Sequence, residues 1–271
     1  MRAIAILLLL FLVSAAAQAQ QDAKPTLSMT VTGHIEIAPD GSLHTYQLDK
    51  DKGLPPAVQQ LVEQNLRGWT FEPITVDGRP VIARTRLRLM LSAEEVTGGY
   101  QLKVENVWFG EPTRSSKMRP PQYPMQAAYA GLGARVILVL KLDASGKVID
   151  VHSEQTSLGA ITKNEKQAEE WRAVFEKVSV AAARRWKFDV TEIIEGAPVE
   201  TSSVRVPVDF EMMGSTSKNR WRGYVPGPRR PAPWVADEVA ATHAIDNLGA
   251  NDTQPLDSRF KLKTQVVGVL L

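Results

Sequence analysis

Histidine side chains can take the widest range of chemical roles, because imidazole acts as a general base and as a metal ligand near neutral pH. The chain holds four of them: His34, His44, His152 and His243. His34 and His44 fall on opposite limbs of one predicted hairpin without a carboxylate cluster, so we expect half-exposed strand positions rather than a metal site. Glu169 and Glu170 are adjacent on a predicted helix and point about 100° apart, which favours a solvated face over an acid–base pair.

Composition narrows the remaining chemistry. The 271 residues are 44% hydrophobic, which allows a sizeable core and, by length, about two domains. Cysteine is absent, which excludes disulfides, thiolate catalysis and Cys-ligated zinc, and a net charge of +2 is too balanced for a dedicated nucleic-acid binder. The sequence has no Gly-rich phosphate loop, nucleophile elbow or His-Glu-x-x-His motif. We therefore expect no catalytic residue, no cofactor and no nucleic-acid partner.

Residues 1–19 have the pattern of a secretory signal peptide. Arg2 precedes an apolar run from Ala3 to Ala17, and Ala17-Gln18-Ala19 offers the small-x-small pattern that signal peptidase reads. The run is shorter than the roughly twenty residues that span a bilayer. We expect export to the periplasm with cleavage before Gln20. The alternative is an uncleaved anchor in the inner membrane, with the chain facing the periplasm.

The rest of the chain repeats one pattern of elements. Alternating runs meet at Asp40-Gly41 and at Asp143-Ala-Ser-Gly146, and the glycine at each turn predicts a β-hairpin. Apolar residues at helical spacing then predict one amphipathic helix in each half, over 58–69 and 171–186. Long alternating strands, over 82–91 and 204–212, close the two halves.

Both predicted helices end in a Trp-x-Phe phrase, and we expect its aromatic side chains to form structural core where helix meets sheet. These residues are Trp69, Phe71, Trp186 and Phe188. The predicted fold class is α+β, with two tandem β-β-α-β modules, each a small antiparallel sheet with one helix packed across it. The first module covers 27–112 and includes an extra strand, the second covers 113–213, and a Pro-rich extension follows over 214–271.

The sheet edges are the surfaces of interest, because an open sheet has unpaired backbone groups that an extended partner can occupy by strand addition. Arg84, Arg86 and Arg88 would protect the edge of the first copy. The final strand of the second copy is less protected, although Pro207 removes one donor and makes pairing along its full length doubtful.

A longer motif extends this interpretation. Pro121-Gln-Tyr-Pro124, the strand from Val136 with its Asp143–Gly146 turn, and Ala181-Ala-Ala-Arg-Arg-Trp-Lys-Phe188 resemble the C-terminal domain of TonB-type energy transducers. The resemblance covers residues 119–213 well and 27–92 as a degenerate copy without the Tyr-Pro element. In that family the domain is periplasmic and binds a short segment of outer-membrane receptors by adding a strand to its sheet.

The resemblance implies partner-binding residues in the Tyr-Pro element and in the final strand. These are Tyr123, Pro124, Val204, Arg205, Val206, Val208 and Phe210. The implied function is non-enzymatic periplasmic protein binding associated with TonB-type outer-membrane transport. A receptor segment or another component of the TonB system is the implied partner, and pairing of two chains into a homodimer is left open.

The chain departs from the family at its start. TonB-type transducers keep an uncleaved anchor followed by a long Pro-rich spacer, whereas here the first predicted strand begins soon after the signal site. A soluble binding or adaptor role then fits better than energy transduction. Two alternatives stay open: a membrane-anchored TonB-like transducer, and an exported hydrolase with no recognisable motif.

The extension is basic and aromatic before it becomes apolar. Its basic residues are Lys218, Arg220, Arg222, Arg229 and Arg230. Peripheral contact with the cell envelope is one interpretation, and a tail that wraps its own domain is the preferred one. We further expect a short helix over 237–248 and a terminal strand, Phe260–Leu271, that pairs with a sheet edge and occupies the site of a partner.

Overall fold

The computed structural model describes residues 27–49, 53–115, 118–211, 223–236 and 253–271. They form a mixed α+β structure of mostly antiparallel strands with three helices. The predicted signal peptide, the predicted helix over 237–248, and Lys218, Arg220 and Arg222 lie outside the described residues. None of the helices in the described part of the chain is both long and apolar enough to cross a lipid bilayer.

The first sheet is built around a central strand and carries one helix. Its long strands are β1 (Leu27–Ile37), β2 (Leu43–Leu48), β5 (Ala83–Val96) and β6 (Gly99–Phe109). β1 lies between β2 and β5, and β6 pairs with β5. The helix α2 (Pro56–Leu66) begins at a proline, which the first helical turn tolerates, and buries Val62 and Leu66 in the same core as Val31 and Leu89.

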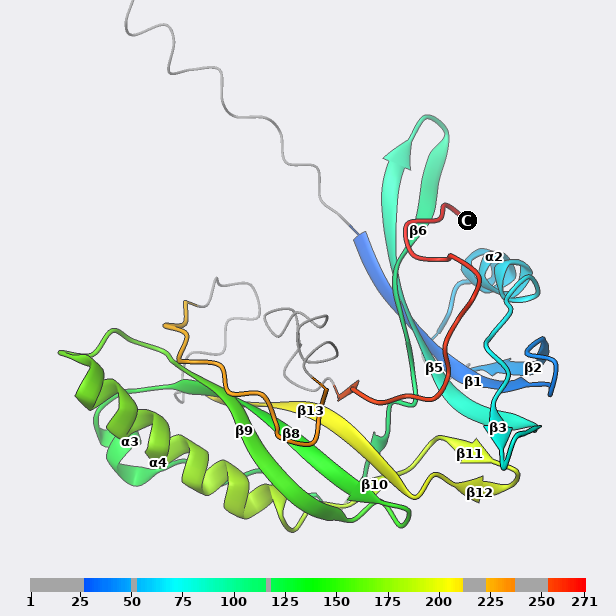
Figure 1. Cartoon of the computed structure of the whole chain (residues 1–271). Coiled ribbons are helices and arrows are strands. Elements are labelled where there is room, and N and C mark those ends of the chain that lie inside the picture. The colour runs from blue at the N-terminus through cyan, green and yellow to red at the C-terminus, as the bar shows by residue number, and fades with distance from the viewer. Residues whose placement is uncertain (1–26, 50–52, 116–117, 212–222, 237–252) are drawn as a thin grey trace, which may run out of the picture.

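The second sheet has the same arrangement of its three long strands (Figure 1). These are β8 (Ala134–Asp143), β9 (Val148–Leu158) and β13 (Thr201–Phe210), with β8 between the other two, and the short β14 (Gln254–Pro255) pairs with β13. The helix α4 (Glu165–Ala183) packs on one face of this sheet and buries Phe175 there. It begins earlier than predicted because the side chain of Asn164 accepts the N–H of Gln167 at 2.9 Å and caps it.

Each Trp-x-Phe phrase follows one of the two long helices, where the chain returns to the turn of the preceding hairpin. Trp69, Phe71, Trp186 and Phe188 all have exposed fractions of 6% or less. The N–H of Phe71 donates to Gly41 O, and the N–H of Phe188 donates to Gly146 O, both at 2.8 Å. Each phrase therefore fastens the end of a helix to the turn of the preceding hairpin.

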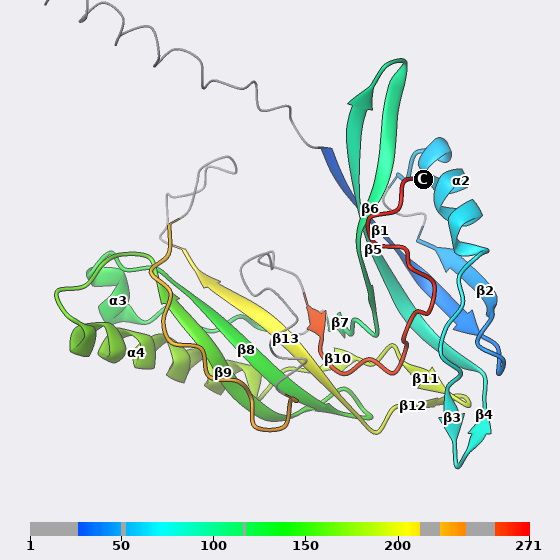
Figure 2. The ribbon, with the colours of Figure 1, turned by 45° about the horizontal axis from the view of Figure 1, so that its top comes forward.

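The first sheet also includes a hairpin from the second half of the chain. The short hairpin of β11 (Ile193–Ile194) and β12 (Ala197–Pro198) follows α4 but pairs with β5 of the first sheet, as Figure 2 shows. Burial of apolar side chains explains this pairing, because Ile194 and Val199 belong to the hydrophobic core of the first sheet. In the first half the equivalent hairpin, β3 (Thr75–Val76) with β4 (Arg79–Pro80), forms a separate two-stranded sheet.

The terminal residues do not form the predicted continuous strand. They meet the first half at two isolated bridges, Phe71 with Leu262 and Lys103 with Leu270. Phe260 and Val266 are buried in the core of the first sheet. The alternating sequence thus places apolar side chains in a core, while the backbone makes scattered hydrogen bonds with residues 70–72 and with β6.

We expect the hairpin turn of the second sheet to tolerate no side chain at Gly146. Its φ is +77°, and a Cβ there would lie 1.7 Å from the carbonyl oxygen of Phe188. Gly196 is a matched control, because its φ is +80° and a Cβ there would meet nothing within 4 Å. Gly196→Ala should lower the free energy of unfolding by about 1–2 kcal/mol from its left-handed backbone alone. Gly146→Ala should lower it by more than about 3 kcal/mol in urea denaturation, and equal losses would contradict the close approach.

Candidate functional site

A groove of about 610 Å³ runs between the outer edge of β13 and the linker that precedes α3 (Met125–Tyr129). We use the term linker for residues 110–115 and 118–124. The residues lining it are Arg114, Ser115, Met118, Arg119, Pro120, Pro121, Tyr123, Trp186, Pro207, Val208, Asp209, Phe210 and Glu211. Its lining mixes aromatic, proline and thioether side chains with charged groups. A concave surface of this kind can hold an extended peptide.

The Tyr-Pro element, Tyr123-Pro124, holds the linker side of this groove against the hydrophobic core of the second sheet. The hydroxyl of Tyr123 donates to Leu132 O at 2.8 Å, and its ring packs edge-on against Phe175 and Phe210 at 6.1 and 5.7 Å between centroids. Burial raises the pKa of the Tyr123 phenol, so the hydroxyl stays a donor at neutral pH. Pro124 is buried beside it and occupies the N-cap position of α3.

The second Trp-x-Phe phrase holds the other part of the linker. Trp186 donates its indole N–H to Arg119 O at 2.7 Å. β7 (Thr113–Arg114) pairs with β10 (Phe188–Asp189), immediately after the tryptophan. The linker is therefore held near Arg114 and near Arg119 by residues that belong to the hydrophobic core of the second sheet or lie next to it.

The short strand β14 pairs with only part of the outer edge of β13. Leu256 donates its N–H to Ser203 O at 2.9 Å, and Ser203 donates its N–H to the Asp257 carboxylate at 2.7 Å, so the backbone groups of Ser203 point away from β8. Since these directions alternate along a strand, Pro207 also faces outward, where its missing N–H costs no bond to β8. β14 pairs with Val204 and Arg205, and over 206–210 no strand of the described chain lies beside this edge.

Beside this edge lies a buried ionic cluster. Arg205 and Glu154 are essentially inaccessible to solvent, and the Arg205 guanidinium donates to the Glu154 carboxylate through Nη2 at 2.8 Å and to the side chain of Gln254 through Nη1 at 2.7 Å. Arg229 donates to the same carboxylate through Nη2 at 2.9 Å. One carboxylate from β9 thus holds both a strand residue and a residue of the C-terminal extension.

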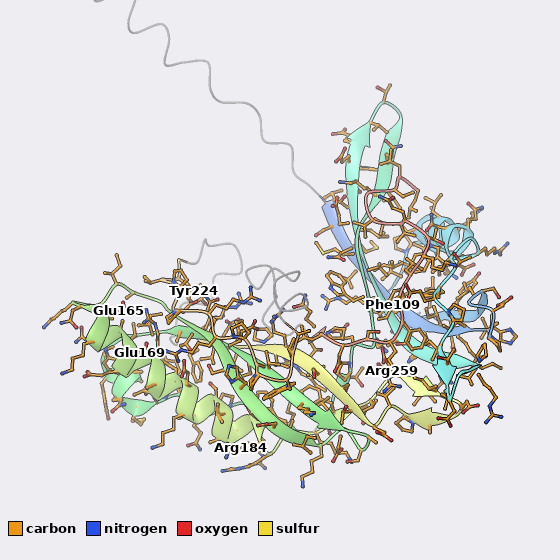
Figure 3. The ribbon with its side chains drawn as sticks, in the orientation of Figure 1. Phe109, Glu165, Glu169, Arg184, Tyr224 and Arg259 are labelled. Carbon is orange, nitrogen blue, oxygen red and sulfur yellow. The ribbon has the colours of Figure 1, made fainter. Side chains whose placement is uncertain are left out.

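The extension follows the sheet as a covering layer. Val225 pairs with Leu158 at the edge of β9, and Ala232 and Leu256 pack on Val139, on the face opposite α4. Arg230 forms an ion pair with Glu169 at 2.6 Å, at the end of α4 where Figure 3 labels Glu165, Glu169 and Tyr224. Both Arg229 and Arg230 therefore have carboxylate partners within the chain.

Glu192 and Asp257 form an acidic pair where the extension crosses from the second sheet to the first. Glu192 accepts from Ser258 Oγ and from the N–H of Arg259, and Asp257 accepts from Ser203. Burial raises the pKa of the Glu192 and Asp257 carboxyl groups, and the negative charge of Asp257 raises that of Glu192 further. Arg259 lies beside the first sheet (Figure 3) and partly offsets this effect.

His34, His44 and His152 do not gather into a site, and His243 lies outside the described residues. His34 lies opposite Gln47 in the first hairpin, while His44 is 3.8 Å from Glu36. His152 contacts Arg230 O at 2.8 Å. Within the described ranges, no group of three or more His, Asp or Glu side chains is arranged to hold a metal ion.

Sequence reasoning missed the residues that organise the C-terminal extension. Glu154 occupies one position of an alternating strand and looks like a solvent-facing carboxylate, and nothing local marks Gln254 or Glu192 as buried. The absence of a strong strand pattern around β14 hid its pairing with β13. The available signal was the excess of arginine in the extension, which needed a carboxylate partner somewhere in the fold.

Comparison with known proteins gives a distant, partial match. The chain is 33% identical over 98 residues to the proteins named Protein TonB from two strains of Xanthomonas campestris pv. campestris. The match covers 36% of this chain and 37% of each relative, so the chain matches little more than a third of the length of these curated relatives. No family model matches the sequence, and no solved structure matches it.

We expect the buried cluster to dominate the stability of the second half. Glu154→Gln leaves Arg205 without its buried counter-charge and should lower the free energy of unfolding by about 3–5 kcal/mol. Glu170→Gln is the control, because Glu170 lies on the exposed surface of α4, and should cost about 0.5 kcal/mol or less. Urea denaturation of the two variants measures both losses, and similar values would argue against the cluster.

The acidic pair predicts that the extension is held more firmly in acid. Because the folded-state pKa values of Glu192 and Asp257 are raised, their protonation stabilises the fold fully below their unfolded values, near 4, and this stabilisation is lost as pH rises through the raised values. Glu192→Gln should flatten the pH dependence of the melting temperature between pH 4 and 8, whereas Glu170→Gln on the exposed surface of α4 should leave it unchanged. A steeper dependence in Glu192→Gln would contradict this assignment.

Proposed function

We propose that this chain is a non-enzymatic protein-binding module of the cell envelope, associated with TonB-related outer-membrane transport. The observation that carries the proposal is the groove of about 610 Å³ between β13 and the linker, which the Tyr-Pro element and Trp186 line together with Val208 and Phe210. The partial similarity to Protein TonB supports a binding role over a catalytic one.

The binding mode is strand addition by an extended segment of an outer-membrane receptor or of another component of the TonB system. Such a segment lies along Val206–Phe210, with the groove on its other side. The set of binding residues is narrower than the sequence predicts. Val204 and Arg205 lie opposite Pro255 and Gln254 of β14. The side chains of Val206, Val208 and Phe210 are buried in the core of the second sheet, so we assign them to the support of the strand wall, and Tyr123 and Pro124 to the support of the opposite wall.

We further propose that 27–112 and 113–213 are two copies of one module, of which only the second binds. Both sheets order their long strands in the same way, and both hairpin turns have a glycine with positive φ, Gly41 and Gly146. The first copy lacks the Tyr-Pro element, and its closing strand β5 pairs with β6 and with β11. Partner capture by the second copy alone follows from this difference.

Localisation in the periplasm is part of the proposal and has a direct test. Residues 1–26 lie outside the described part of the chain. N-terminal sequencing of the protein from the envelope fraction should give Gln20 as the first residue of a released module. Met1 as the first residue would instead favour the membrane-anchored transducer.

The groove can be tested with a side-chain substitution that leaves the backbone edge intact. Met118→Asp places a charge among the half-buried lining of the groove, whereas Met125→Asp places it at an exposed position of α3 outside the groove. We expect Met118→Asp to weaken binding of a synthetic peptide from an outer-membrane receptor segment at least tenfold, because an unpaired carboxylate is costly in an apolar contact. Met125→Asp should stay within twofold in isothermal titration calorimetry. Equal affinities for both variants and the unaltered protein would remove the groove from the binding site.

A further inference from the structure

Two lysines lie opposite each other near the hairpin turn of the second sheet. Lys147, just before β9, and Lys187, just before β10, form an isolated antiparallel bridge, so their side chains lie on the same face of it. Both are exposed, and in the described part of the chain neither forms an ion pair. Like charges directly opposite each other destabilise a strand pair, so this arrangement lowers the stability of the fold.

The neighbouring carboxylates do not neutralise the two lysines. Asp143 accepts the N–H of Ser145 at 2.9 Å, the hydroxyl of Ser145 at 2.7 Å and the N–H of Lys147 at 3.0 Å. It therefore holds the turn through the backbone of Lys147, and its charge offsets only part of the positive charge nearby. Asp189 follows Lys187 by two positions, and its carboxylate contacts the hydroxyl of the opposite threonine at 3.5 Å.

Two arginines extend this positive surface at the end of α4 (Figure 3). Arg184 and Arg185 are exposed, and neither has an ion pair within the described ranges. The helix dipole favours cations at a helix C-terminus and accounts for the arginines, but it does not account for the two opposed lysines. We call Lys147, Arg184, Arg185 and Lys187 the basic patch.

The basic patch borders the groove at Trp186. This residue lies between Arg185 and Lys187 in the chain, lines the groove, and donates its indole N–H to Arg119 O at 2.7 Å. Tyr123 and Phe210, whose rings pack together, line the part of the groove nearest α3. A segment bound along the groove would therefore meet the basic patch at only one of its own ends.

We infer that the basic patch receives acidic residues of the partner, next to the stretch that the groove holds. This inference rests on the proposed function and adds the chemistry of its ligand, which is an extended segment with Asp or Glu at one end. Carboxylates placed between the opposed lysines relieve their repulsion and form charge-assisted hydrogen bonds with them. A broad anionic lipid surface fits less well, because it would also repel the exposed carboxylates of Asp150 and Asp189.

Peptides with matched tails test the basic patch. The probes are synthetic peptides from one outer-membrane receptor segment, with three aspartates or three asparagines added at either end, titrated into the full chain by calorimetry. We expect one of the two aspartate-tailed peptides, and not the other, to bind about five- to tenfold tighter than its asparagine counterpart at about 20 mM NaCl, because a few exposed ion pairs form. In about 0.5 M NaCl this gain should fall below about twofold.

Substitutions assign the gain to the basic patch. Lys147→Gln with Lys187→Gln should remove the gain and leave binding of the asparagine-tailed peptides within twofold. Lys163→Gln with Lys166→Gln is the matched control and should keep the gain, because these lysines are exposed near the start of α4 and have no ion pair in the described chain. Lys187→Glu places a carboxylate opposite Lys147, so it should raise the melting temperature while removing the gain.

Other outcomes contradict the inference in distinct ways. Equal binding of the aspartate- and asparagine-tailed peptides at both ends would remove the basic patch from the site and leave the proposed function intact. A gain that persists in Lys147→Gln with Lys187→Gln would place the acidic contact elsewhere. Binding of phosphatidylglycerol vesicles that this double variant abolishes, without a gain for either aspartate tail, would assign the basic patch to lipid. If no peptide binds, the proposed function fails and the inference fails with it.

Discussion

The Glu154 carboxylate is the interaction on which the second half of the molecule depends. A carboxylate removed from water is stable only when it is fully paired, and here the guanidinium groups of Arg205 and Arg229 supply that pairing. One of these arginines belongs to β13 and the other to the extension, far along the chain. The requirement to satisfy one charge thus forces the extension onto the sheet and, through Gln254 on Arg205, fixes β14 against the edge of β13.

The pairing of Glu154 holds the extension over the second sheet, and the path of the extension determines where the groove lies. The extension pairs with β9 at Leu158 and with β13 as far as Arg205, and its apolar residues close the face opposite α4. Helix α4 closes the other face. The groove is left beside the remaining part of β13, where Tyr123 and Trp186 fix the linker to the rest of the second half.

Much of the local structure could be predicted from the sequence because its causes are local. The hairpin turns follow from glycines at Gly41 and Gly146, the helices from their apolar periodicity, and the burial of Trp186 and Phe188 from their place at the end of a helix. The partners of Glu154 could not be predicted, since they come from residues more than fifty positions away. Strands of two residues, such as β11 and β14, show no periodicity at all, so the joining of the two sheets was invisible until the fold was known.

The burial of Phe260 and Val266 has a consequence for how the molecule is made. They lie in the same core as Val31, although they are far from it in the sequence. When the chain is delivered residue by residue, from a ribosome or through a membrane pore, that core stays unfinished until Val266 has emerged. A nascent chain that has not yet reached Phe260 would therefore present exposed apolar surface of this core to chaperones and proteases.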